Sequence, residues 1–109
     1  MWKVKEEVNL RELEKFGFDD CSTRYYRYYR DNDYIWVDKY NRIIDFRYHW
    51  AGILNESIEP ETAISKTIIT KLTKAGLVEK VIKVVDKYGF IKYIKSDCFK
   101  EVEKVVENE

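Results

Sequence analysis

The chain has 109 residues, 45% of them hydrophobic, with 20 basic and 20 acidic side chains. This length fits one domain, and a chain with this share of hydrophobic residues and no net charge lies far from the composition of disordered proteins. No stretch approaches the ~18 apolar residues of a membrane span, the first residues are too charged for a signal peptide, and zero net charge disfavours coating of nucleic acid by electrostatics alone. We therefore expect a cytoplasmic protein in which Cys21 and Cys98 are free thiols.

The first predicted element is a short helix within residues 9–18. Asn9 is a good N-cap residue, and Glu12 three positions later would complete a capping box. Gly17 can adopt the left-handed conformation that ends a helix, which would let Phe18 pack back on the helix. Its buried stripe is expected to be Leu10, Leu13 and Phe16.

Three strands are predicted next, because residues 24–50 hold 10 of the 17 aromatic residues and five of the six arginines. Aromatic and β-branched runs separated by turn clusters are typical of strands. We place the strands near residues 23–30, 34–38 and 43–50, which leaves turns at 31–33 and 39–42.

The register of these strands follows from the loop lengths. A two-residue loop at 32–33 would place Tyr28 opposite Val37, and a four-residue loop at 39–42 would place Val37 opposite Ile44. Because side chains alternate along a strand, a slip by one residue would exchange the two faces of the sheet. The predicted apolar face is Tyr26, Tyr28, Ile35, Val37, Ile44, Phe46 and Tyr48. The other face carries Tyr25, Arg27, Tyr29, Tyr34, Trp36, Asp38, Ile43, Asp45, Arg47 and His49.

The rest of the chain alternates between helix and strand signals. Residues 51–59 are expected to form a loop, and a helix with Pro60 in its first turn is expected to run from about Glu59 to Gly76. Residues 77–95 fit either a helix or a hairpin, and the dense β-branched residues and the Asp86-Lys-Tyr-Gly89 turn favour the hairpin. A last helix is predicted from Ser96 or Asp97 to Glu107.

The expected fold class is therefore α+β, in the order α-β-β-β-α-β-β-α. It is a single domain over residues 1–109, in which helices pack on one face of an antiparallel sheet.

The segments Asn-Leu-Arg-Glu-Leu-Glu-Lys-Phe-Gly-Phe (9–18) and Lys-Ala-Gly-Leu-Val-Glu-Lys-Val (74–81), with a Tyr-rich sheet between them, carry a resemblance. Together they resemble a type of small, uncharacterised protein encoded by low-GC Gram-positive bacteria and their prophages. The resemblance covers roughly residues 8–81, and the chain runs on through 82–109. It supplies no catalytic residues and implies a bacterial or phage-related cytoplasmic accessory protein.

Few residues point to catalysis or to a metal. The only histidine is His49, and the two cysteines lie far apart in the sequence. A metal site or a nucleophilic enzyme would need such groups in clusters. The paired carboxylates lie in turns and charged helix faces, where solvated surface is their ordinary role. We therefore expect no metal, no cofactor and no enzymatic apparatus.

The second face of the sheet provides the candidate binding residues, which are Arg27, Tyr29, Tyr34, Trp36 and Arg47. Tyr, Trp and Arg are the residues that anchor protein interfaces, so we expect a protein partner or self-association and no membrane. Purely structural interpretations remain open, because these side chains could pack as cross-strand pairs or lie under a helix.

The alternative partner is a nucleic acid, since aromatic rings stack on bases and arginine contacts phosphates. It would bind either the same face or a C-terminal half that resembles a winged helix. That half carries lysines at 66, 71, 74, 80, 83, 87, 92 and 95, and residues 51–109 contain ten basic and ten acidic side chains in all.

Overall fold

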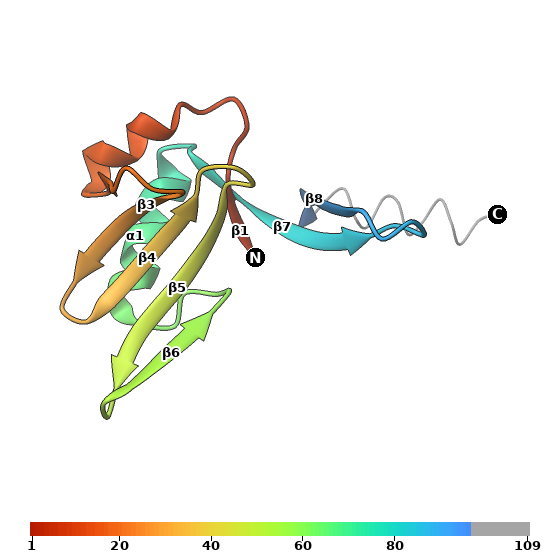
Figure 1. The fold of residues 1–109 in the computed structure, drawn as a ribbon. Coiled ribbons are helices and arrows are strands. Elements are labelled where there is room, and N and C mark those ends of the chain that lie inside the picture. Colours follow the sequence, from red (N-terminus) through yellow and green to blue (C-terminus); the bar gives the residue numbers. More distant parts are fainter. Residues whose placement is uncertain (97–109) are drawn as a thin grey trace.

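The computed structural model describes residues 1–96 of the chain (Figure 1). The helix predicted to end at Glu107, and Cys98 within it, lie outside the described residues. The elements follow one another as β1 (Trp2–Val4), the 3₁₀ helix η1 (Leu10–Phe16), β2 (Asp19–Asp20), β3 (Tyr25–Arg30), β4 (Asp33–Asp38), β5 (Ile43–Trp50), β6 (Ile53–Ser57), α1 (Ala63–Lys74), β7 (Val78–Val85) and β8 (Ile91–Lys95).

The strands form one antiparallel sheet in the order β2-β3-β4-β5-β1-β7-β8, and β6 also pairs with β5. Two strands thus share one edge of β5: Ile43 and Ile44 pair with β1, and residues 46–50 pair with β6. In Figure 1, α1 lies behind the strands β3, β4 and β5 and leaves their other face open. The α+β class and the antiparallel sheet are confirmed, whereas the predicted element order is wrong, because β1, β2 and β6 were not expected.

The β3–β4 turn differs from the predicted one. Asp31 and Asn32 form its two-residue loop, with φ angles of 47° and 69°, and positive φ at both positions is what the twist of a tight hairpin requires. Asp33 then belongs to β4, and Tyr28 faces Ile35 instead of Val37. Because this shift is by two residues, each side chain keeps its predicted face.

The β4–β5 register agrees with the prediction, since Val37 lies opposite Ile44. Leu13, Phe18 and Leu72 from the covering segments are fully buried against the predicted apolar face. That face is confirmed: Tyr26, Tyr28, Ile35, Val37, Ile44 and Phe46 are buried, and Tyr48 is half-buried.

The first helix forms where it was predicted, but as a 3₁₀ helix. The Asn9 side chain accepts a hydrogen bond from the Arg11 amide at 3.0 Å, and Gly17 is left-handed with φ of 93°. The predicted capping box is wrong, because Glu12 pairs with Lys15. The Phe18 amide donates to the Leu13 carbonyl, and Phe18 packs into the core as expected.

The prediction that residues 51–59 form a loop is wrong, because β6 occupies most of this segment. Ala51 and Gly52 both have positive φ, 51° and 78°, and close a two-residue hairpin in which Trp50 pairs with Ile53. This hairpin adds a fourth strand beside β3, β4 and β5.

The helix α1 begins later than predicted, at Ala63 instead of Glu59. Its N-cap is Thr62, whose hydroxyl accepts from the Ser65 amide while the Ser65 hydroxyl accepts from the Thr62 amide. The Thr62 hydroxyl also donates to the carboxylate of Asp33, which is buried. At the other end, the Leu77 amide donates to the Leu72 carbonyl, which is the expected glycine-terminated ending at Gly76.

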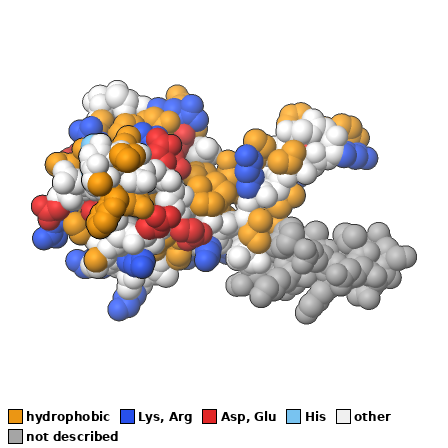
Figure 2. Space-filling view, turned by 90° about the horizontal axis from the view of Figure 1, so that it is seen from below, with side chains coloured by type: hydrophobic (Ala, Val, Ile, Leu, Met, Phe, Trp, Pro, Cys, Tyr) orange, Lys and Arg blue, Asp and Glu red, His pale blue; other side chains and the backbone are white. Residues whose placement is uncertain are grey.

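The strands β7 and β8 form the hairpin that the sequence favoured over a helix. In its turn the Asp86 carboxylate accepts hydrogen bonds from the amides of Tyr88 and Phe90. We call residues 78–95 the arm, because this hairpin projects from the rest of the sheet in Figure 1. Figure 2 shows hydrophobic and basic side chains along it.

Candidate protein-interaction face

The side of the sheet opposite α1 is uncovered by any other described helix. We call it the open face. The strand registers place side chains from four strands on it, and these are Tyr25, Arg27, Tyr29, Tyr34, Trp36, Asp38, Ile43, Asp45, Arg47, His49, Leu54 and Glu56. Asp38 and Ile43, both predicted for this face, are buried.

One row of cross-strand neighbours is aromatic. Tyr29 lies opposite Tyr34, with 4.8 Å between the ring centroids, and His49 lies 5.7 Å beyond Tyr34. Tyr29 is 57% exposed, whereas Tyr34 is half-buried between its neighbours. Lateral packing thus orders these rings while leaving Tyr29 open to solvent.

Trp36 occupies the centre of the open face. The ring of Tyr25 meets it edge-on with 5.2 Å between the centroids, and the Cζ atom of Arg47 lies 4.6 Å from the Trp36 ring centroid. Its indole Nε1 is enclosed and makes no hydrogen bond to the described residues. Trp36 therefore serves mainly to pack the side chains of this face together. A binding partner could contact its ring surface but could not hydrogen-bond to its enclosed Nε1.

The basic and acidic groups of the face alternate across the strands. Arg47 lies opposite Glu56, with 3.4 Å between its Nε and the Glu56 Oε1, and Trp36 separates Arg27 from Asp45. Within the described residues Arg27 makes no ion pair, and its side chain is exposed. Arg27 is accordingly the cation of this face that is best placed to meet a partner.

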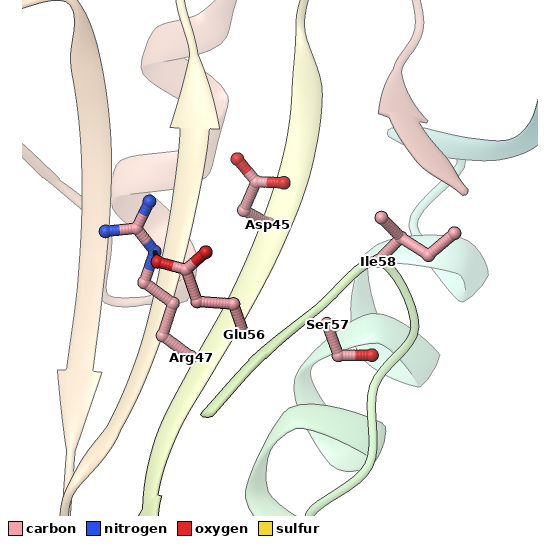
Figure 3. Close-up of a pocket in the computed structure, with 5 residues that line it drawn as sticks. All are labelled: Asp45, Arg47, Glu56, Ser57 and Ile58. Atoms are coloured by element: carbon pink, nitrogen blue, oxygen red, sulfur yellow. Dashed lines mark ion pairs between the residues drawn. The ribbon is translucent and has the colours of Figure 1, made fainter. Parts of the chain in front are cut away.

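A polar pocket of about 430 Å³ lies where β5 changes its pairing partner from β1 to β6 (Figure 3). Asp45 is the residue of β5 between the two pairings, and it shares the pocket with Arg47 and Glu56. Burial raises the pKa of Asp45; the Arg47 guanidinium acts in the opposite direction, and Glu56 and Asp38 add to the rise. One base faces two acids in this pocket, a formal charge of −1, so the pocket disfavours an anionic ligand.

A second and more apolar hollow of about 330 Å³ adjoins Trp36. Tyr25 and Trp36 contribute its aromatic walls, Cys21 and Thr23 its far side, and Arg27 its charged rim. An apolar wall with one guanidinium at its rim is the usual form of an interface anchor site.

The structure brings all five sequence-predicted binding residues onto one face. Arg27 and Tyr29 are exposed, whereas Tyr34, Trp36 and Arg47 are half-buried. The sequence-based reasoning missed the residues that β6 adds, which are Leu54 and Glu56. A glycine two residues after Trp50, followed by Ile53 and Leu54, was the available signal of a hairpin there.

No protein-family model, no curated protein and no solved structure matches this chain. Among the described residues, none of the helices has the length and apolar character needed to cross a membrane. Within the same part of the chain, His, Cys, Asp and Glu side chains do not gather in groups that could hold a metal ion.

Proposed function

We propose that this chain is a non-enzymatic binding module that docks a protein partner, or a second copy of itself, on the open face. The observation that carries the proposal is the juxtaposition of Arg27, Tyr29, Tyr34, Trp36 and Arg47 on a sheet face that no described helix covers. A prophage-related accessory role is the context that the resemblance of residues 9–18 and 74–81 adds to it.

The chemistry of the face indicates what the partner presents. An apolar side chain would enter the hollow beside Trp36, and a neighbouring carboxylate would meet Arg27. The exposed Tyr29 ring would then cover the contact with a large, rigid surface at small entropic cost. The partner segment is therefore apolar with an acidic flank.

A nucleic acid is the weaker occupant of this face. Asp45 and Glu56 stand among its basic groups, and Arg47 already contacts Glu56 and the Trp36 ring. Such carboxylates repel phosphates and cancel the field that a polyanion needs.

Photo-crosslinking from the open face tests the proposal. A benzophenone side chain at position 29 should give protein adducts in extracts of the source cells, and unlabelled wild-type protein should compete them away. The same group at position 40 is the matched control, because Tyr40 is similarly exposed, 79%, and lies in the turn between β4 and β5, outside the open face. Light scattering over a range of concentrations shows whether the adduct is a second copy.

Unlabelled protein with the change Arg27→Ala should compete at least tenfold more weakly for the partner than unlabelled wild type, because an interface anchor contributes about 2 kcal/mol or more to the binding free energy. Arg27 is exposed, so this change leaves the fold intact. Equal adduct yields from positions 29 and 40, or full competition by the Arg27→Ala protein, would refute the open face as the binding site.

A further inference from the structure

The balanced charge of the whole chain conceals a strongly basic stretch. Residues 63–96 contain eight lysines and only two acids, Glu79 and Asp86, a formal charge of +6. Residues 51–62 and 97–109 carry −3 each and restore neutrality. The helix α1 holds three of these lysines and no acid, and of the two acids Glu79 is paired with Lys95.

Several of the lysines surround an indole ring. Trp2 of β1 lies opposite Lys80 of β7 and Ile44 of β5, so it points to the side of the sheet that α1 covers. There a hollow of about 380 Å³ opens between Trp2 and α1, with Ile69 in its apolar wall and Lys66 and Lys74 at its rim. We call it the Trp2 hollow.

The indole is held in place from its edge. Trp2 Nε1 donates to the carboxylate of Glu59 at 2.9 Å, and the Lys80 Nζ lies 5.9 Å from the centroid of the Trp2 ring. Burial of Glu59 acts to raise its pKa, but the Met1 amino group and the Trp2 indole outweigh it, and the pKa is lowered. The ionised carboxylate thus holds the edge of the ring, and the charge of Lys80 also favours its ionised form.

The basic surface continues in both directions from this hollow. A second hollow along α1 shares Lys66 and Lys74 and adds Lys71. On the other side, Lys80 lies near the start of the arm, and the strand registers place Lys92 on the same face of the arm and Lys83 and Lys95 on the opposite one. Two exposed aromatic rings lie at its turn, Tyr88 at 73% and Phe90 at 67%.

These side chains suit a nucleic-acid strand better than a protein. The lysine ammonium groups are point charges that attract any polyanion, phosphates included, so it is the aromatic rings beside them that favour a nucleic-acid strand. Aromatic rings beside a cationic track stack on bases of any sequence. The hydroxyls of Thr70 and Thr73 donate to carbonyls of α1, so their protons are engaged within the helix.

We propose that α1, the Trp2 hollow and the arm form a sequence-independent binding surface for single-stranded nucleic acid. Lys66, Lys74 and Lys80 contact phosphates, and Trp2 stacks on a base. This site is separate from the open face and does not depend on the function proposed for that face.

Fluorescence anisotropy with a labelled single-stranded oligonucleotide of mixed sequence tests the site. The wild-type full chain should bind at about 50 mM salt and lose affinity steeply as salt rises. Lys74→Gln/Lys80→Gln should lower the slope of log affinity against log salt by about 1.4 and weaken binding on the order of fiftyfold at that salt, because each single-strand phosphate contact contributes about 0.7 to the slope.

The matched control is Arg11→Gln/Lys15→Gln, which removes the same charge from exposed positions on η1. It should bind nearly as the wild type does. Trp2→Leu should lower affinity for the single strand while Trp2→Phe preserves most of it, with folding of both checked by circular dichroism.

Three results would overturn the proposal. They are no oligonucleotide binding at about 50 mM salt, equal losses in the two double variants, and tighter binding of polyglutamate than of the oligonucleotide. The last result would assign the basic surface to an acidic protein segment.

Discussion

The contact between Thr62 and Asp33 joins the N-terminus of α1 to the first residue of β4, and its removal gives a sharp test of how the fold is held. Thr62→Ala removes the N-cap hydroxyl, which contributes about 1 kcal/mol to helix stability. It also deprives the Asp33 carboxylate, 8% exposed, of the Thr62 donor. An acceptor left unsatisfied in such a place costs about 1–3 kcal/mol.

The two effects together predict a loss of about 2–4 kcal/mol in the free energy of unfolding. That is a large share of the 5–15 kcal/mol typical of a small domain, and it corresponds to a fall in Tm of about 10–20 °C. Urea titration followed by tryptophan fluorescence measures it, with the midpoint falling while the m-value stays constant.

Thr62→Ser keeps the hydroxyl and should remain within about 1 kcal/mol of the wild type. Thr67→Ala is the matched control on the same helix, because Thr67 is exposed and its hydroxyl donates only to the Ala63 carbonyl; it should change stability by less than about 0.5 kcal/mol. If Thr62→Ala costs no more than Thr67→Ala, the reasoning is wrong and the Asp33 carboxylate is satisfied by solvent.

Three further substitutions test individual turns and charges of the fold. Replacing Asp31-Asn32 by Asn-Gly should stabilise the β3–β4 hairpin by up to about 1 kcal/mol, because that pair adopts positive φ most readily; a lower Tm would show a different turn. Since burial raises the pKa of Asp45, its carboxylate disfavours the folded state at neutral pH. Asp45→Asn should therefore be more stable than the wild type at pH 7, and this difference should disappear as the pH falls below 3.8, the ordinary pKa of an aspartate. Urea titrations at pH 7 and at a pH below 3.8 would check the sign. Asp86→Ala should abolish hydrogen-exchange protection of β8 while leaving β4 protected, because the carboxylate holds two turn amides; unchanged β8 protection would count against that role.

The division of the central sheet into two faces could be predicted because it depends only on the alternation of side chains. The loop between β3 and β4 was misplaced by one residue, which shifted the pairing of Tyr28 by two, yet an even shift returns every side chain to its own face. The glycine endings of η1 and α1 were predictable for a similar reason, since Gly17 and Gly76 adopt the left-handed conformation that few other residues tolerate.

The missed elements are those that need tertiary contacts to form. The strand β1 has three residues and β2 has two, and both exist through pairing with neighbours that no local pattern reveals. The start of α1 was misjudged because Pro60 and Thr62 are competing helix-start signals, and the buried Asp33 that favours Thr62 lies far away in the sequence. Which face of the sheet α1 would cover could not be predicted, because both faces carry aromatic side chains.

The two surfaces proposed here differ in one physical respect that the net charge obscures. The open face mixes arginines with Asp45 and Glu56, so its field is weak and its contacts depend on shape and ring surface. The surface around Trp2 has lysines at its rim and an ionised Glu59 that is engaged at the ring edge. Binding at the first should therefore fall mildly with salt, through the contact of Arg27, and binding at the second should fall steeply with it. A chain that is neutral as a whole can thus hold a local polyanion site, because screening makes each contact depend on charges within about 10 Å and not on the sum over the molecule.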